Sequence, residues 1–189
     1  MQRIIHRGSG TEKLRVVPAA VQGVLDALLT SPAYVKTPAW DIVAWNAAAL
    51  AVLTNFGVLP PRERNVLRRL FGAPAVHASL PDWEADARFA VAAFRVDAAR
   101  AGDCPEAAAI AAELQATSAD FRRLWAENEV RSHWFGLKRF QHPVAGPLTL
   151  EYSTFSVDGG DGLSMIVFTP ASPADAQAIA ALLSDRSRA

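Results

Sequence analysis

The sequence predicts an α+β domain with one five-stranded antiparallel sheet, helices packed mainly on one face of it, and an additional N-terminal helix. Three observations support this fold class. Two short extended runs come early in the chain, one around Tyr34 and Val35 and one in WDIVAW at 40–45. A long stretch of helical character follows, and after residue 130 three β-like runs alternate with turn residues. Strands that are separated from a run of helices in this way are typical of the α+β class.

The first 17 residues are polar and basic and contain GSG, which predicts a flexible tail or linker at 1–17. We expect the folded domain to span 18–189. Its first helix begins near Pro18, because the apolar side chains that follow recur on one helical stripe. They are Val21, Val24, Leu25, Leu28 and Leu29.

Asn46 stands between the strand-like run WDIVAW and the alanine-rich run AAALAVLTNF. An Asn side chain can accept a hydrogen bond from a backbone N–H two or three residues further on, so Asn46 is predicted to cap the start of a helix. Gly57 is suited to the C-terminal end of the same helix. Asn46 therefore marks a junction between a strand and a helix.

Apolar periodicity between Pro and Gly residues predicts the remaining helices. They lie at 60–72, 82–102, 105–118, 119–130 and 173–185. The three late β-like runs are HWFGLKRFQH, GPLTLEYSTFSV and LSMIVFTP, and their links PVAG and DGGDG predict an antiparallel meander. Two early strands and three late strands around a helical middle follow the order of a PAS-like sensor domain.

Five separated motifs then point to a known family. They are PAYVKTPAWDIVAWNAAALAVL, RERNVLRRLF, DWEADARFAVAAFR, ADFRRLWAENEV and KRFQHPVAGPLTLEY, in this order along the chain. From about Val21 to Pro170 the sequence resembles the ligand-binding domain of MmyB-like transcription regulators. The resemblance implies a PAS-like fold that accepts a fatty-acid-like or similar apolar small molecule. In that family the domain usually follows an N-terminal helix-turn-helix domain that binds DNA.

The sequence departs from the family pattern at its N-terminus. Only about 17 residues precede the sensor region, and a helix-turn-helix domain needs several packed helices. We therefore expect DNA contact only through a helix-turn-helix domain that is not present in this chain. Two interpretations stay open, a fragment of a longer regulator and a stand-alone sensor.

An apolar ligand needs a lined tunnel, in which each buried methylene contributes roughly 0.8 kcal/mol. Aromatic side chains predicted for that lining are Trp45, Phe71, Phe94, Trp125, Phe140, Tyr152 and Phe155. Aliphatic candidates are Leu137, Leu150 and Val167. The alternative for each of these residues is that it simply fills a hydrophobic core.

A buried carboxylate head group requires charge or several hydrogen-bond donors. The candidate donors are Asn46, Arg64, Asn65, Arg68, Arg95 and His142, with hydroxyls from Tyr34 and Tyr152. Arginine is the strongest type, because its guanidinium can bind a carboxylate through two parallel hydrogen bonds. Structural alternatives remain for each. They are a helix cap for Asn46, a solvated face for Arg64 and Arg68, a surface or tertiary hydrogen bond for Asn65, a structural role for His142, and a protein hydrogen-bond partner for each tyrosine. For Arg95 the alternative is an internal ion pair or a side chain that reaches past apolar neighbours to solvent.

Composition excludes several function classes. Hydrophobic residues make up 51% of the chain, which provides for a sizeable core, and the formal net charge is zero, which argues against direct grip on nucleic acid. The lone Cys104 suits a reducing compartment, and no apolar run is long enough to span a bilayer. We therefore expect a soluble cytoplasmic protein without membrane contact.

Motifs for catalysis and metal binding are missing from the sequence. It contains no GxSxG, HExxH, Walker or CxxC motif, and its four His residues are widely scattered. The two Asp residues of VDGGDG lack the further acids of a calcium loop and are best explained by a hairpin turn. We predict no catalytic residues, no metal and no cofactor.

Two hypotheses for function follow. The first is the ligand-sensing domain of a bacterial-type transcription regulator that binds a fatty-acid-like or other apolar small molecule in a PAS-like cavity. The alternative is a protein–protein interaction module, whose interior is filled by side chains and which forms a homodimer through its sheet face or first helix.

Overall fold

The computed structural model describes residues 17–127, 135–160 and 162–188. The tail predicted at 1–17 lies outside these ranges except for Val17, and so do the first two residues of the predicted run HWFGLKRFQH. Among the described residues the strands are β1 (Ala33–Lys36), β2 (Ile42–Trp45), β3 (Phe135–His142), β4 (Gly146–Ser156) and β5 (Ser164–Pro170). The α-helices are α1 (Ala19–Ala27), α2 (Ala47–Val52), α3 (Val66–Gly72), α4 (Pro74–Ser79), α5 (Trp83–Arg100), α6 (Pro105–Thr117), α7 (Ala119–Ala126) and α8 (Pro173–Arg188). Two short 3₁₀ helices are η1 (Phe56–Val58) and η2 (Pro61–Glu63).

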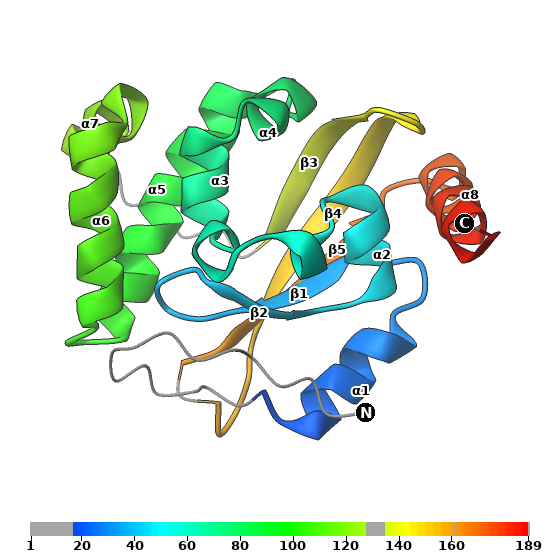
Figure 1. Ribbon diagram of the computed structural model, residues 1–189, viewed down its shortest axis with the longest axis horizontal. Coiled ribbons are helices and arrows are strands. Elements are labelled where there is room, and N and C mark those ends of the chain that lie inside the picture. Colours follow the sequence, from blue (N-terminus) through cyan, green and yellow to red (C-terminus); the bar gives the residue numbers. More distant parts are fainter. Residues whose placement is uncertain (1–16, 128–134, 161, 189) are drawn as a thin grey trace.

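All five strands form one antiparallel sheet in the order β2-β1-β5-β4-β3 (Figure 1). The late strands make a meander, as predicted, and β1 pairs with β5 so that the early hairpin joins its edge. This arrangement confirms the predicted α+β class with a five-stranded antiparallel sheet and is consistent with a PAS-like domain. Figure 1 shows α3 to α7 grouped beside the sheet and α8 at the other end of the molecule.

The two faces of the sheet are covered differently. Because side chains alternate along a strand, Tyr34, Ile166 and Phe168 share one face, where they pack with residues of α2 and α8. Val35 and Val167 point to the opposite face and pack with Leu25 of α1. The predicted N-terminal helix is present as α1, and it covers the face opposite to the one that packs with α2 and α8.

A second hydrophobic core lies within the helical group itself. Phe94 of α5 and Phe121 of α7 are fully buried there, and Leu67 of α3 and Leu114 of α6 pack into the same cluster. Trp40, from the turn between β1 and β2, also enters this cluster. The helical group is therefore a packed body that lies against the sheet at one end.

Several predicted helix boundaries were wrong. The helix predicted at 60–72 is divided, because Asn65 adopts an extended conformation and its side-chain oxygen accepts hydrogen bonds from Leu67 N and Arg68 N, which begins α3. Pro74 then begins the separate helix α4, which was not predicted. The helix that was predicted to reach Gly57 ends at Val52 and is followed by η1.

Asn46 caps α2 as predicted, since its Oδ1 accepts a hydrogen bond of 2.9 Å from Ala49 N. The same side chain also binds three other backbone groups: Oδ1 accepts from Ala33 N, and Nδ2 donates to Leu28 O and Ser31 O. Asn46 therefore joins the segment after α1, strand β1 and helix α2.

Candidate functional site

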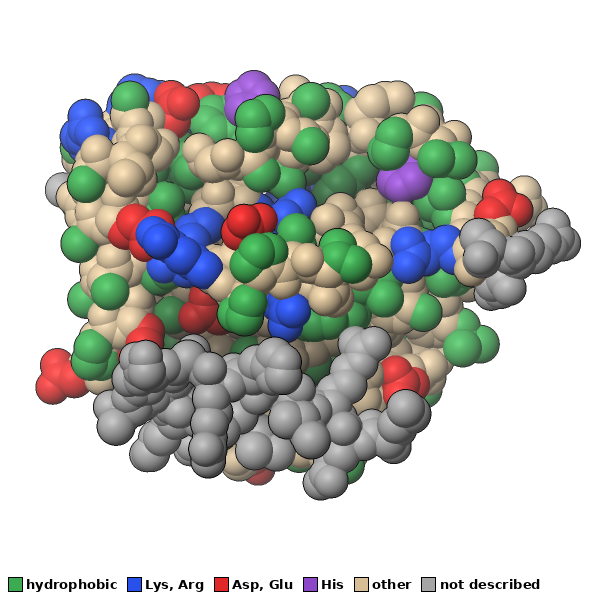
Figure 2. All heavy atoms as spheres, in the orientation of Figure 1, with side chains coloured by type: hydrophobic (Ala, Val, Ile, Leu, Met, Phe, Trp, Pro, Cys, Tyr) green, Lys and Arg blue, Asp and Glu red, His purple; other side chains and the backbone are tan. Residues whose placement is uncertain are grey.

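A cavity of about 1350 Å³ lies between the inward face of the sheet and helices α3, α4 and α5. It exceeds the range of about 300–1,000 Å³ that is usual for small-molecule sites. Figure 2 shows the surface hollowed between the helices and the sheet, with hydrophobic side chains inside the hollow. Its apolar walls include Ile42, Val66, Leu80, Phe89, Phe140 and Phe168.

Small residues on the facing elements leave this space unfilled. Helix α5 presents Ala90 and Ala93 to the cavity, and β3 contributes Gly136. A Cβ at Gly136 would lie 3.0 Å from Cε1 of Tyr152, a tighter contact than most, so the glycine gives the tyrosine ring room to lie over this strand. The ring of Tyr152 in turn packs edge-on against Phe89, with centroids 5.4 Å apart.

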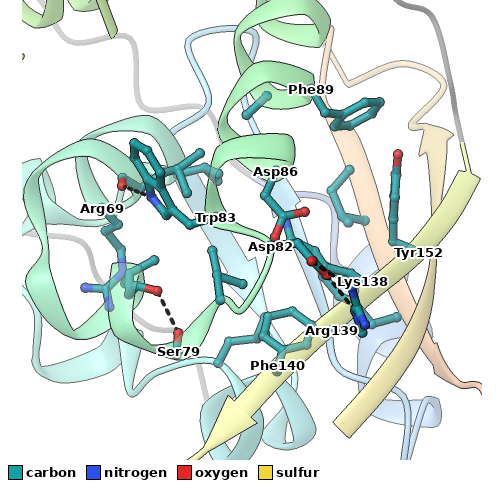
Figure 3. A pocket seen from close by; sticks show the side chains of 18 of the residues that line it. Arg69, Ser79, Asp82, Trp83, Asp86, Phe89, Lys138, Arg139, Phe140 and Tyr152 are labelled. Carbon is teal, nitrogen blue, oxygen red and sulfur yellow. Dashed lines mark hydrogen bonds and ion pairs between the residues drawn. The ribbon is translucent and has the colours of Figure 1, made fainter. Parts of the chain in front are cut away.

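Charged side chains from β3, from α5 and from Asp82 just before α5 meet on one wall of the cavity (Figure 3). Asp82 binds Arg139 through two hydrogen bonds of 2.6 and 2.7 Å. One turn further along, Asp86 faces Lys138 at 3.6 Å. Burial raises the pKa of the Asp86 carboxyl, and the Lys138 charge opposes this shift. Burial and the nearby Asp86 charge raise the pKa of Tyr152 to about 12.

A second polar group of the cavity wall is buried more deeply. Lys36 Nζ lies 2.5 Å from Asp97 Oδ2 and 4.0 Å from the ring centroid of Trp40, whose indole N–H donates to the same carboxylate oxygen at 2.8 Å. Burial lowers the pKa of Lys36 to about 8, although the Asp97 charge raises it. Trp40 has a φ of 65°, a left-handed conformation that is unusual for a bulky residue, so the turn holds the indole over the lysine at some cost in strain.

Arg69 of α3 brings a guanidinium to the same cavity. Its Nη2 donates a 3.3 Å hydrogen bond to Thr54 Oγ1, and within the described parts of the chain no carboxylate forms an ion pair with it. Burial lowers the pKa of Arg69, and the charge of Glu63 partly offsets this effect. The cavity therefore contains one arginine whose charge no ion pair within these residues balances.

Four of the predicted site residues line the cavity: Tyr34, Phe140, His142 and Tyr152. Tyr34 packs between Phe56 and Phe168, and burial raises the pKa of its hydroxyl. The His142 ring is fixed by the backbone, because Nδ1 accepts from Val144 N and Ala145 N and Nε2 lies 3.0 Å from Ala51 O. This pattern requires the proton on Nε2. Leu137 also lines the cavity, although its side chain is mostly exposed.

The other predicted polar residues have partners elsewhere in the fold. Asn46 and Asn65 are buried helix caps, and Asn65 also donates to Ala39 O and Asp41 Oδ1. Arg68 points to α6, where it binds Glu113 at 2.7 Å. Arg64 Nε donates to Leu59 O. The structure does not bring these four residues to the cavity wall.

Arg95 and most of the predicted aromatic residues lie in packed regions instead. Arg95 donates to Trp125 O and stacks over the Trp125 ring, with Cζ 4.2 Å from its centroid. Phe71, Phe94 and Trp125 belong to the core of the helical group, and Trp45 packs beside Phe56 and Arg64. Leu150 is fully buried in the sheet core, Val167 faces α1, and Phe155 is 54% exposed.

Sequence reasoning missed Lys36, Arg69, Asp86 and Lys138. For Lys36 a signal was present, because it is two residues beyond Tyr34 on a strand and so shares its face. Asp86 lies three residues before Phe89 and seven before Ala93, on the helix stripe that faces the cavity. The alternation that places Phe140 on the inward face of β3 places Lys138 there too.

Neither a membrane-spanning helix nor a metal cluster occurs among the described residues. No helix among them has the length and apolar character needed to cross a membrane. No group of three or more metal-binding side chains occurs in the described part of the chain.

Comparison with known families places the chain in a described class. The family model for the MmyB-like transcription regulator ligand binding domain matches residues 17–182, nearly the whole described chain. A search among curated proteins found no match.

Proposed function

The chain belongs to the family of MmyB-like transcription regulator ligand-binding domains, and we propose that it binds a fatty-acid-like molecule in the cavity between sheet and helices. A domain of this family is a regulator's ligand-binding part and not an enzyme. The observation that carries the proposal is the cavity of about 1350 Å³, whose walls combine aromatic and aliphatic side chains. The competing hypothesis, an interaction module with a filled interior, does not account for that space.

The size of the cavity suits a long apolar chain. A tail of about ten carbons would gain of order 8 kcal/mol on full burial, at roughly 0.8 kcal/mol per methylene. Association itself costs about 4–15 kcal/mol, so part of the affinity has to come from the polar end of the ligand.

Arg69 is the residue that best fits the head group. Its guanidinium lines the cavity and has only the Thr54 hydroxyl as a side-chain partner among the described residues. A ligand carboxylate would complete a charge-assisted pair there, whereas the other cations of the cavity, such as Lys36 and Arg139, already face an aspartate. The sequence-based choice of Arg64, Arg68 or Arg95 is thereby replaced by Arg69 in our proposal.

Ligand occupancy would act on transcription through a separate DNA-binding domain. A ligand shifts an equilibrium between two arrangements only when it binds one of them better. The cavity is shared by the sheet and by α3, α4 and α5, so a bound chain would favour one packing of the helices against the sheet. This change of packing would alter DNA binding by an attached helix-turn-helix domain, which the family resemblance implies, in the cytoplasm.

Substitution of Arg69 by Gln tests this assignment. The variant should bind a long-chain fatty acid about tenfold to a hundredfold more weakly, because a hydrogen bond to a charged group contributes roughly 1.5–3 kcal/mol. It should bind the methyl ester of the same acid as the wild type does. Isothermal titration calorimetry measures both affinities.

The matched control is Arg64→Gln, which removes a guanidinium from the same segment outside the cavity. This control should leave the affinity for acid and ester unchanged. Equal loss of acid and ester in the Arg69 variant, or no loss of either, would reject Arg69 as the head-group residue.

A further inference from the structure

The ion pair between Asp86 and Lys138 differs from its neighbour on the same wall. Asp82 and Arg139 lie in contact through two short hydrogen bonds of 2.6 and 2.7 Å. Asp86 and Lys138 come from the same part of the fold, yet their charged atoms are 3.6 Å apart. At that distance the two groups attract each other, but any hydrogen bond between them is long and weak.

Both side chains have hydrogen-bonding capacity that the described protein does not use. Only 17% of the Asp86 side chain and 21% of the Lys138 side chain are exposed. Within the described residues neither side chain has a hydrogen bond shorter than their mutual contact of 3.6 Å, and Asp86 Oδ2 is closed off from solvent without a hydrogen-bond partner. A buried polar group left unsatisfied costs about 1–3 kcal/mol, so this pair calls for an explanation.

The surroundings of the pair are apolar. Phe89, Phe140 and Tyr152 line the cavity close to Asp86 and Lys138, and in Figure 3 the Asp86 carboxyl points from α5 toward Lys138 on β3. An unsubstituted alkyl chain that passed this wall would remove the two charged groups from water and give neither a hydrogen bond. A chain that carries a polar group at this level would not have that penalty.

We propose that Asp86 and Lys138 form a second polar contact for the ligand, which binds a hydroxyl group on an otherwise apolar acyl chain. The inference rests on the proposed function, since it concerns the same cavity and names its ligand more closely as an oxygenated fatty acid. One hydroxyl oxygen can reach two atoms that lie 3.6 Å apart with hydrogen bonds of ordinary length. It donates to the Asp86 carboxylate and accepts from the Lys138 ammonium.

The charges of the pair select a neutral group. A second carboxylate beside Asp86 would be repelled, and an amine would meet the same repulsion from Lys138. A hydroxyl both donates and accepts, and it carries no charge. This matters because the site is poorly solvated, as the raised pKa of the buried Asp86 carboxyl indicates. Aspartate side chains have a broad range of χ2 angles, so a small turn of the carboxyl brings either oxygen to the ligand.

The test compares fatty acids of one chain length by calorimetry. The set contains the unsubstituted acid and positional isomers that carry one hydroxyl at successive places along the chain. In the wild type, one isomer should bind about tenfold more tightly than the unsubstituted acid, because sites with buried polar groups discriminate against ligands that lack the matching group. Isomers with the hydroxyl far from that position should bind more weakly.

The variant Asp86→Leu with Lys138→Met removes the polar contact and keeps the bulk of both side chains. It should lose the preference for the hydroxylated isomer and bind the unsubstituted acid at least as well as the wild type. The control variant Asp82→Leu with Arg139→Met removes the adjacent pair, whose groups satisfy each other. The control should retain the preference, and circular dichroism shows whether both variants are folded.

The outcomes separate this inference from the proposed function. If the unsubstituted acid binds and no hydroxylated isomer binds more tightly, the hydroxyl contact is rejected while fatty-acid binding stands. The hydroxyl contact is likewise rejected if the Asp86/Lys138 variant keeps the preference. If no fatty acid of the set binds at all, both the proposed function and the hydroxyl contact fall.

Discussion

Replacement of Asn46 by Ala should destabilise the domain far more than the loss of a helix cap. Asn46 is 3% exposed, and its side chain makes four hydrogen bonds of 2.8–3.0 Å to the backbone of Leu28, Ser31, Ala33 and Ala49. A net contribution of about 1 kcal/mol for each bond gives a loss of about 4 kcal/mol, against about 1 kcal/mol for a cap alone.

Urea denaturation followed by circular dichroism measures this loss directly. For a domain of this size each kcal/mol lowers the melting temperature by about 2–4 °C, so Asn46→Ala should melt about 8–16 °C below the wild type. Asn46→Asp tests separately the two hydrogen bonds that Asn46 Nδ2 donates. This variant keeps an oxygen that accepts from Ala33 N and Ala49 N, but it places negative charge near the carbonyl oxygens of Leu28 and Ser31.

The matched control is Asn55→Ala, which removes the cap of η1. That cap is one exposed hydrogen bond of 3.2 Å to Gly57 N, and its loss should cost less than about 1 kcal/mol. If Asn46→Ala and Asn55→Ala destabilise the domain equally, or if Asn46→Asp is as stable as the wild type, the joining role of Asn46 is refuted.

Two further changes probe the cavity wall and the pH response. Gly136→Ala should weaken fatty-acid binding in calorimetry, because the new Cβ would lie 3.0 Å from the Tyr152 ring and displace it. Unchanged affinity would show that the position of this ring does not determine the shape of the cavity. Hydrogen bonds from Arg68 and Arg62 lower the pKa of the Glu113 carboxyl to about 2. The ionised Glu113 therefore stabilises the fold at pH values above the ordinary pKa of a glutamate, and this stabilisation is lost as the pH falls toward 2. Urea titrations at several pH values should therefore show a smaller acid-induced loss of stability for Glu113→Gln than for the wild type. The difference should be modest, because solvent screens the ion pair between Arg68 and Glu113. Equal losses of stability in the variant and the wild type would contradict this.

The meander of the three late strands was predictable because its signals are local. Turn residues separate the three late strands, and Gly159 and Gly162 adopt positive φ in the loop between β4 and β5, as the glycines of DGGDG suggested. The helix cap at Asn46 was also predictable, because a short polar side chain precedes a run of alanines. Asn65 is also a short polar residue at the start of a helix, but the apolar periodicity around it predicted one continuous helix.

The composition of the cavity wall was less accessible, because it depends on which face of a helix meets the sheet. Arg68 and Arg69 are adjacent in the sequence, yet Arg68 reaches Glu113 on α6 and Arg69 lines the cavity. Aromatic residues gave no guidance either: Phe94 fills the core of the helical group, while Phe89, about one and a half turns earlier, faces the cavity. The same residue types build a filled core and a lined cavity, and only the packing of α5 against its neighbours separates them.

Native mass spectrometry of the chain purified from a bacterial host tests most directly whether the interior holds an apolar guest. We expect one small molecule per chain, released on denaturation and identified as a fatty acid or an oxygenated relative, and its replacement by added fatty acid in excess. A bare chain that takes up no fatty acid under these conditions would contradict the account.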